Sequence, residues 1–593
     1  MAVSNTESGS SLESVPLGRQ LVDPRIGDIE DDLTSPKQRS LIAIAGGLLA
    51  EISLPKLLFA WTMSLILPAV LLGVAPLIAT AWLTSVSEHV LALTEVGAAF
   101  VLVAIVGLGW LGWRPLLRIV ENNFWSLNAL VVQPGYLLGC ELLRHLAERI
   151  FAGHLTTVGP GRLRATSSAA AGILMCACGT LIVILLWPSS RWIGAVSDVA
   201  SLHHLILPTL ANAAILVSGY LAIASLVWGF ADATMDQPVN LNTLDNPSSD
   251  RRSWRVAHLS DLHVVGERYG FRIESGRSGP QGNERVYRAL ARLAAIHAKS
   301  PIDLVLVSGD MTDAGRAAEW AEFMDAIGEF PALAERMLLV PGNHDVNIID
   351  RSNPARLDLP FSPTKRLRQM RTLSAMAAVQ GDRVQVFDHD QKPRQTLNQA
   401  LTPQRRQIAR FAEDGGVRLS IDVGRIYHDQ FPMILAPGEP DGLGVAILNS
   451  NAECHFSFTN ALGFMSAQQL HRLLSAIAAF PRAIWIIALH HHLLEYPMPV
   501  SFSERVGTAL VNGSWFVRKL KPFAARMVVM HGHRHIDWIG TCGLLKIISA
   551  PSPVMGASDD THFHIHTVVA ERDGRIGLRS PERVEISDPK AIL

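Results

Sequence analysis

The sequence has few cysteines and little charge, and both shortages limit what the protein does. Its five cysteines among 593 residues form no Cys-x-x-Cys pair, are odd in number and stand among apolar neighbours. They are predicted to be reduced packing residues in a reducing compartment, which disfavours zinc-finger chemistry. A net charge of -1 and a pI of about 7.1 give no case for nucleic-acid binding. With 18% charged residues and a mean hydropathy of +0.23, the chain is more apolar than an average soluble protein, which points to the membrane.

The N-terminus lacks a short basic start followed by an apolar core. Residues 1–40 are rich in Ser, Asp, Glu and Pro, so we expect a disordered tail and not a cleaved signal peptide. No internal repeat is present.

Four segments between residues 41 and 230 contain no Asp, Glu, Lys or Arg. Each is close to the roughly 17 to 25 residues that a helix needs to cross a bilayer. They are residues 57–83, 97–113 (the shortest), 167–187 and 205–230. The stretch 124–140 is broken by Pro134, and we expect it to lie at the interface. Because no charged residue stands within a span, the usual mark of an ion path is absent, which favours an anchor over a transporter.

Loop charges predict how this membrane domain is oriented. The segment between the second and third spans carries six arginines, whereas residues 84–96 carry no Lys or Arg. By the positive-inside tendency, the N-terminal tail and everything after the fourth span are cytoplasmic. We therefore expect a multi-pass protein of the inner (cytoplasmic) membrane, with a polar linker over residues 231–253.

From residue 254 to 593, short apolar runs alternate with helical patterns, which argues for an α/β domain. Helices are expected at 283–298 and 317–327. Strands are expected at 255–260, 302–308, 337–340, 444–448, 483–489, 527–530 and 544–548.

Polar residues follow five of these strands. They are Asp261 and His263, then Asp310, then Asn343, His344 and Asp345, then His490, and finally His533 and His535. Carboxyl ends of strands are where α/β proteins place their chemistry. With His344 and Asp345 set aside, two Asp, one Asn and four His offer oxygen and nitrogen ligands without a thiolate, a set suited to Mn, Fe or Zn. Seven ligands are too many for one metal and are sensible for two that share a carboxylate.

In order, the blocks Asp-x-His, Gly-Asp, Gly-Asn-His-Asp, His and Gly-His-x-His resemble those of the calcineurin-like metallophosphoesterase superfamily, over residues 254–570. The resemblance implies two packed β-sheets flanked by helices and two divalent or trivalent metal ions. It implies that Asp261, His263, Asp310 and His535 hold one metal. Asp310, Asn343, His490 and His533 would hold the second. His344 is then the catalytic histidine, and Asp345 orients His344 or its loop.

A mechanism follows from that resemblance. Two metals about 3.5–4 Å apart lower the pKa of a shared water. The bridging hydroxide attacks the phosphorus of a phosphodiester or phosphomonoester, and His344 protonates the leaving alkoxide or stabilises the transition state.

Three parts of the domain leave alternatives open. Many relatives have His-x-Pro in the fourth block, whereas this chain has His490-His491-His492. We expect His491 and His492 to be supporting or solvent-exposed imidazoles. The alternating His562, His564 and His566 are expected to line one face of a C-terminal strand and not to bind metal.

The third part of the domain that leaves alternatives open is the insertion over residues 346–443. Substrate-shaping segments occur at this place in the superfamily. The basic cluster of the insertion, Lys365, Arg366, Arg368 and Arg371, is expected on a solvated helix face; the functional alternatives are binding of lipid headgroups or of a substrate phosphate.

Substrate and function class also have alternatives. Residues 444–451 and 463–470 resemble cyclic-nucleotide phosphodiesterase-like members, with Ser466 as a helix N-cap, whereas a membrane anchor equally suggests a phospholipid or lipid-linked substrate. We expect a phosphodiesterase rather than a phosphomonoesterase, with a lipid bilayer and no specific nucleic acid as partner. The alternative is a membrane sensor or transport-associated protein that uses the fold as a binding module. A third possibility is that the helices bind a ligand or partner and regulate catalysis.

Overall fold

The computed structural model describes most of the chain, apart from several gaps. Its longer described stretches are residues 66–91, 133–150, 160–195, 203–241, 251–267, 283–349, 362–386, 395–414, 417–454, 457–498, 510–555 and 561–586. The chain divides into a helical unit, Leu41–Pro238 with Leu493–Arg518, and an α/β unit that holds Val239–His492 and Lys519–Leu593. The predicted N-terminal tail lies outside the described residues.

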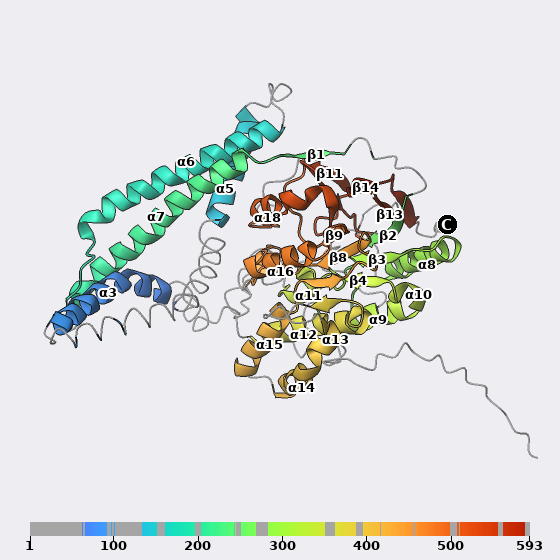
Figure 1. Ribbon diagram of the computed structural model, residues 1–593, viewed down its shortest axis with the longest axis horizontal. Helices are drawn as coiled ribbons and strands as arrows, with labels where there is room; N and C mark the ends of the chain where they lie inside the picture. Colours follow the sequence, from blue (N-terminus) through green and yellow to red (C-terminus); the bar gives the residue numbers. More distant parts are fainter. Residues whose placement is uncertain are drawn as a thin grey trace, which may run out of the picture. The chain divides into compact units, whose positions relative to one another are not determined.

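The described part of the helical unit includes four long helices. They are α3 (Leu67–Leu91), α5 (Gln133–Ile150), α6 (Pro160–Leu186, followed by the 3-10 turn η4, Trp187–Ser189) and α7 (Ile206–Ala233). Helices α6 and α7 lie side by side along their length (Figure 1). At Gly172 an added Cβ would come within 3.0 Å of the Gly229 Cα. Small residues at this crossing therefore allow the two backbones to approach closely, as in membrane helix pairs.

Three helices of the described chain are long and apolar enough to cross a membrane. They cover Ala69–Ser87, Gly161–Ser189 and His203–Ala233. Large apolar side chains on their surfaces are exposed, such as Ile184 at 63% and Leu207 at 64%, which suggests membrane association. These helices match the first, third and fourth predicted segments, whereas nearly all of the second, 97–113, lies outside the described residues.

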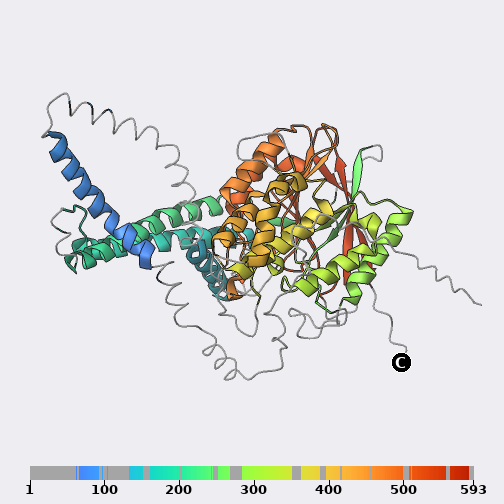
Figure 2. The same ribbon diagram turned by 90° about the horizontal axis from the view of Figure 1, so that it is seen from below.

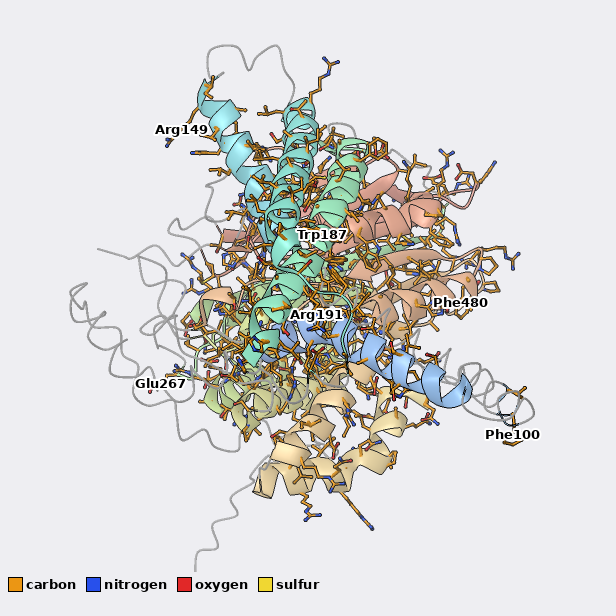
Figure 3. All side chains as sticks on the ribbon, turned by 90° about the vertical axis from the view of Figure 1, so that its left-hand side faces the viewer. Phe100, Arg149, Trp187, Arg191, Glu267 and Phe480 are labelled. Atoms are coloured by element: carbon orange, nitrogen blue, oxygen red, sulfur yellow. The ribbon has the colours of Figure 1, made fainter. Side chains whose placement is uncertain are left out.

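The loop after α6 is fastened by one buried side chain of α7. Figure 3 labels Trp187 at the end of α6 and Arg191 just beyond it. The Asn212 amide nitrogen donates to the Arg191 carbonyl at 2.6 Å and to the Gly73 carbonyl at 3.2 Å, and its oxygen accepts from the Arg191 N–H at 3.1 Å. Asn212 is fully buried, so these hydrogen bonds satisfy a polar group inside an apolar helix.

A segment that follows the fourth predicted block packs with the helices. It includes the start of α18 (Gly513–Leu520). The Arg518 guanidinium lies 2.9 Å from an Asp232 carboxylate oxygen and 5.0 Å from the Trp228 ring. Arg164 donates to the Glu495 carbonyl at 3.5 Å. Residues 493–518 therefore belong to the helical unit although they stand within the C-terminal half of the sequence.

The α/β unit contains two sheets with helices outside them (Figures 1 and 2). The larger has the strand order β1-β11-β12-β10-β9-β8-β7-β5-β6. Its strands are β1 (Pro238–Asn240), β5 (Gln385–Val386), β6 (Gln395–Thr396), β7 (Met433–Leu435), β8 (Leu443–Ile447), β9 (Ile484–Ala488), β10 (Met527–His531), β11 (Trp538–Cys542) and β12 (Leu545–Ser549). Strands β8, β9, β10 and β12 run parallel.

The smaller sheet has the order β14-β13-β2-β3-β4, with β15 also paired to β13. Its strands are β2 (Ser253–Leu259), β3 (Leu304–Val307), β4 (Met337–Leu339), β13 (Thr561–Ala570), β14 (Ile576–Leu578) and β15 (Glu582–Ile586). Strands β2, β3 and β4 run parallel. All seven predicted strands are present, and the expected fold of two sheets flanked by helices is confirmed.

Helices of the α/β unit cover both sheets. They are α8 (Glu284–Lys299), α9 (Ala317–Gly328), α10 (Pro331–Ala334), α11 (Asn343–Val346), α12 (Pro363–Gln380), α13 (Leu397–Leu401), η6 (Thr402–Gln404), α14 (Arg405–Asp414), α15 (Val417–Asp429), η7 (Ser457–Thr459), α16 (Ala467–Ala478) and η8 (Lys521–Arg526). The predicted helices at 283–298 and 317–327 correspond to α8 and α9. Ser466 caps α16, because its hydroxyl accepts from the Gln469 N–H at 3.1 Å, as expected.

Candidate metal centre

Five parallel strands end at the same place and deliver every predicted ligand. Strands β2, β3 and β4 of the smaller sheet lead into Asp261 and His263, Asp310, and Asn343. Strands β9 and β10 of the larger sheet lead into His490 and into His533 and His535. A hydrogen-bond-length contact of 2.9 Å between His490 Nδ1 and the Ser308 carbonyl joins the two sheets at this edge.

The backbone at these positions adopts an uncommon conformation. Among the described non-glycine residues, positive φ angles occur at Asp261 (54°), His263 (42°), Asp310 (50°), His533 (78°) and His535 (53°). Such angles are a few per cent of non-glycine residues and concentrate at functional sites. Preceding Asp310, Gly309 has φ +111°, and a Cβ there would lie 2.2 Å from His490 Nδ1. The turns are thus shaped to aim these side chains inward.

One group of ligand atoms surrounds Asp261. His535 Nε2 lies 3.4 Å from Asp261 Oδ1 and 3.3 Å from His263 Nε2. Asp310 Oδ2 lies 3.9 Å from His263 Nε2. Backbone N–H of His533 donates to both Asp261 oxygens, at 3.1 and 3.0 Å. These atoms include all four members of the first predicted ligand set.

A second group surrounds His490. Its Nε2 lies 3.1 Å from Asp310 Oδ2, 3.0 Å from Asn343 Oδ1 and 3.1 Å from His533 Nδ1. The Asp310 side chain faces both groups, because its Oδ2 lies near His263 in the first and His490 in the second. The structure therefore brings the second predicted ligand set together as well, with Asp310 between the two.

His344 lies beside the ligands and is held by a residue that the sequence analysis missed. The Asp313 carbonyl is 2.6 Å from His344 Nδ1, and a carbonyl only accepts, so Nδ1 carries a proton. The Asp313 carboxylate also lies 3.3 Å from His263 Nδ1. Its position three residues after Asp310 is the signal that marks it. Geometrically, His344 also groups with His263 and Asp310 within metal-binding reach.

Asp345 organises the loops and not the His344 ring. Its carboxylate accepts from the Thr312 N–H and hydroxyl at 2.9 and 2.8 Å and from the Gly342 N–H at 2.9 Å. Burial and the nearby Asp310 raise the pKa of Asp345 to about 7, against these hydrogen bonds. Asp345 thus ties the turn after β3 to the turn after β4.

The two histidines that follow His490 are buried. His491 and His492 are 0% and 2% exposed, so solvent exposure, one of the two expectations, is wrong. His491 Nδ1 lies 2.9 Å from the Ser450 hydroxyl, and its ring centroid lies 4.4 Å from that of His533. The His492 ring stacks on that of His533 with centroids 6.1 Å apart, so both rings pack beside a candidate ligand.

The charges of the site fit a bound cation. Burial opposes ionisation of Asp310, but His490 and other histidines hold its pKa well below the usual range. Burial lowers the pKa of His490, yet Asp310 prevails and raises it to about 9. Among the described residues, Asp261 and Asp310 form ion pairs with histidines alone. A field that retains a proton on His490 favours a metal cation at the same nitrogen, and the buried oxygen and imidazole donors suit divalent metals.

The basic cluster of the insertion is buried, which contradicts the expected solvated helix face. All four residues are 7% exposed or less: Lys365, Arg366, Arg368 and Arg371. Lys365 donates to the Cys454 carbonyl at 2.8 Å, and Arg366 lies 3.0 Å from Glu453. Their partners lie almost 90 residues further along the chain, so the local sequence gave no sign of them. Helix α12 also reaches the site, since the Thr372 hydroxyl donates to the Asp345 carbonyl at 3.2 Å.

Comparisons with known proteins found one family model and several solved structures that are similar to this chain. Residues 255–537 match the family model of the calcineurin-like phosphoesterases. No protein with a curated description matches the chain. Among solved structures, a dimetal phosphatase from Danio rerio is similar at 12% identity and a TM-score of 0.33, over 56% of this chain and 99% of that one. A Haemophilus influenzae NAD nucleotidase is similar at 12% identity and a TM-score of 0.30, over 57% of each chain.

A calcineurin-like phosphoesterase from Bacillus subtilis is similar at 10% identity and a TM-score of 0.25, over 57% of this chain and 91% of that one. The similarity to the Haemophilus influenzae nucleotidase covers little more than half of that protein's length. At such scores these structural likenesses carry no argument about this chain.

Proposed function

We propose that this chain, whose residues 255–537 match the family model of the calcineurin-like phosphoesterases, is a membrane-associated, metal-dependent hydrolase of phosphodiesters. The main support for this proposal is that two carboxylates, one amide and four imidazoles lie close together at the carboxyl ends of five strands. No described lysine or arginine pairs with either carboxylate, so the site holds a negative field open to cations.

In this proposal Asp261, His263, Asp310 and His535 hold one metal. Asp310, Asn343, His490 and His533 hold the other. When bound, the two metals activate water and neutralise charge on the phosphoryl oxygens. The metals are proposed to be Mn, Fe or Zn, because the donors are oxygens and imidazoles without thiolate.

The remaining chemistry falls to the residues of the chain. His344 donates Nδ1–H to the Asp313 carbonyl, and in its imidazolium form it would give the proton on Nε2 to the leaving alkoxide. Its backbone N–H donates to Asp310 Oδ1 at 2.8 Å, so the same residue positions a proposed ligand. Asp345 fixes both loops and is assigned a positioning role, not a contact with the substrate.

A phosphodiester is proposed ahead of a phosphomonoester because residues 444–451 and 463–470 resemble phosphodiesterase-like members. A cyclic nucleotide and a phospholipid are the two substrates to test. Three apolar helices support an attachment to the bilayer, and the arginine-rich segment between spans supports a cytoplasmic α/β domain in the inner membrane.

A second candidate, regulation of catalysis by the helical unit, is favoured by one observation. Three residues after His490, the chain enters the segment Leu493–Arg518, which groups with the helices. Ligand binding to the helices would then act on the strand end that carries His490. Equal turnover of wild type and Arg518→Met on a soluble substrate would favour a plain anchor; a change in turnover would favour regulation.

The test of the proposed function is a substrate screen with the full-length chain in detergent. The protein is stripped with chelator, reloaded with Mn²⁺ or Zn²⁺, and given bis-p-nitrophenyl phosphate, p-nitrophenyl phosphate, cyclic nucleotides and phospholipids. We expect metal-dependent hydrolysis, faster for diesters. Absence of hydrolysis with every metal and substrate would favour the binding module.

A further inference from the structure

A cluster of two histidines and one aspartate lies outside the candidate metal centre. His562 and His564 stand two residues apart on β13, so their side chains share one face of the strand. Asp537 comes from the end of the loop between β10 and β11. His562 Nε2 and His564 Nε2 each lie 2.9 Å from the same oxygen, Asp537 Oδ2. None of these residues belongs to the two ligand sets described above.

We propose that Asp537, His562 and His564 form a third metal site, for a single borderline divalent cation such as Zn²⁺. Zinc lies about 2.0–2.2 Å from nitrogen and oxygen ligands, which places neighbouring ligand atoms about 3.0–3.5 Å apart. The two nitrogen–oxygen separations come close to this range, and all three ligand atoms lie within 4.8 Å of one another. Two imidazoles and one carboxylate are a donor set that such cations accept.

The exposure of the three side chains fits a metal ion that faces solvent on one side. The Asp537 side chain is 37% exposed, whereas the two histidines are 13% and 10% exposed. Three protein ligands leave coordination positions that water fills from the exposed side. The third alternating histidine, His566, is buried, and its ring lies 5.7 Å from that of His564. His566 thus lies on the same strand without joining the donor set, and the expectation that none of the three binds metal is revised for two of them.

The site lies where a cation would join the two sheets. The loop that ends in Asp537 also carries His533 and His535 and leads into β11 of the larger sheet. Strand β13 belongs to the smaller sheet and pairs with β2, whose end leads to Asp261. A cation held by Asp537 and β13 would therefore fix the loop of one sheet against a strand of the other. We assign it a structural role, because it would hold two candidate ligands of the larger sheet in place.

The experiment counts zinc bound to the full-length protein in detergent. The chain is stripped with chelator, equilibrated with Zn²⁺, desalted and analysed by plasma mass spectrometry. Wild type is expected to hold about three zinc ions per chain, two in the dimetal centre and one at the third site. Asp537→Asn, which keeps the shape of the side chain, and His564→Ala are each expected to lose about one zinc ion.

Two further variants separate this site from the dimetal centre. Asp310→Asn is expected to lose the zinc of the dimetal centre and to keep the third ion. His471→Ala removes an exposed histidine of α16 and is expected to hold as much zinc as wild type. Circular dichroism checks that each variant is folded; if His564→Ala is not, Asp537→Asn decides. Equal zinc content in wild type and folded Asp537→Asn would overturn the third site, whatever Asp310→Asn shows.

Discussion

Replacing His344 by alanine separates proton transfer from metal binding. The variant keeps the backbone N–H that donates to Asp310 Oδ1 at 2.8 Å, so the proposed ligand Asp310 retains its support. What is removed is the ring, together with the hydrogen bond between Nδ1 and the Asp313 carbonyl. His344→Ala should therefore retain its metals while losing turnover.

The size of the loss follows from the role. General acid catalysis contributes about 10²- to 10⁴-fold in rate, which is about 3–5 kcal/mol of activation free energy. The buried Asp313 carbonyl loses a partner, which costs about 1–3 kcal/mol of stability unless water replaces the ring. Because p-nitrophenolate leaves without needing a proton, the loss should be smaller for bis-p-nitrophenyl phosphate than for a diester with an alkyl leaving group.

The assay measures kcat on both diesters and metal content of the same preparations. His471→Ala, which removes an exposed histidine of α16, is the matched control and should behave as wild type in both. If His344→Ala loses metal, then His344 is a ligand, as its grouping with His263 and Asp310 allows, and the reasoning fails. An equal loss on both diesters would refute the proton-transfer role.

Three further predictions concern backbone fit, pH and the helical unit. Gly342→Ala would place a Cβ 2.1 Å from the Asp310 backbone nitrogen. Because Asp310, a proposed metal ligand, would be displaced, kcat should fall about 10²-fold. An unchanged kcat would contradict this geometry. Burial raises the pKa of Glu319 from 4.5 to about 8, so the folded chain holds this proton to a higher pH than the unfolded chain, and stability is lost as the pH rises between those values. Glu319→Gln should reduce this loss when the midpoint of thermal unfolding is measured against pH. Parallel plots for wild type and variant would contradict the prediction. Arg518→Met removes the 2.9 Å ion pair with Asp232 and should destabilise the packing of residues 493–518 by about 1–2 kcal/mol, seen as faster proteolysis of that segment; equal cleavage rates would contradict this.

The α/β fold was predictable because its signals are local. Each buried parallel strand reads as a short apolar run, and each run of this kind is bounded by a polar turn, as at Met337–Leu339 before Asn343. Because the carboxyl ends of parallel strands meet at one edge of a sheet, the strand pattern was enough to bring Asp261 and Asp310 near one another. His490 follows a strand of the other sheet, and its place beside them was expected only from the resemblance to the superfamily. Their roles as metal ligands remain a prediction that only metal analysis tests.

What the sequence did not reveal depends on contacts between distant segments. The charges of Lys365 and Arg366 are satisfied by residues almost 90 positions away, so the helix that carries them reads as exposed. The segment around Arg518 carries no apolar run that would link it to helices near Asp232. Asp537 and the two histidines of β13 likewise meet only once both sheets are folded.

The most direct test of the dimetal hydrolase is a comparison of wild type with Asp310→Asn. Both full-length proteins are stripped with chelator, supplemented with Mn²⁺, and assayed for metal content and for hydrolysis of bis-p-nitrophenyl phosphate. We expect stripping to abolish wild-type activity and Mn²⁺ to restore it. In Asp310→Asn, metal at the centre and activity should both be absent, because Asp310 faces both ligand groups. Full activity of Asp310→Asn would contradict the central claim.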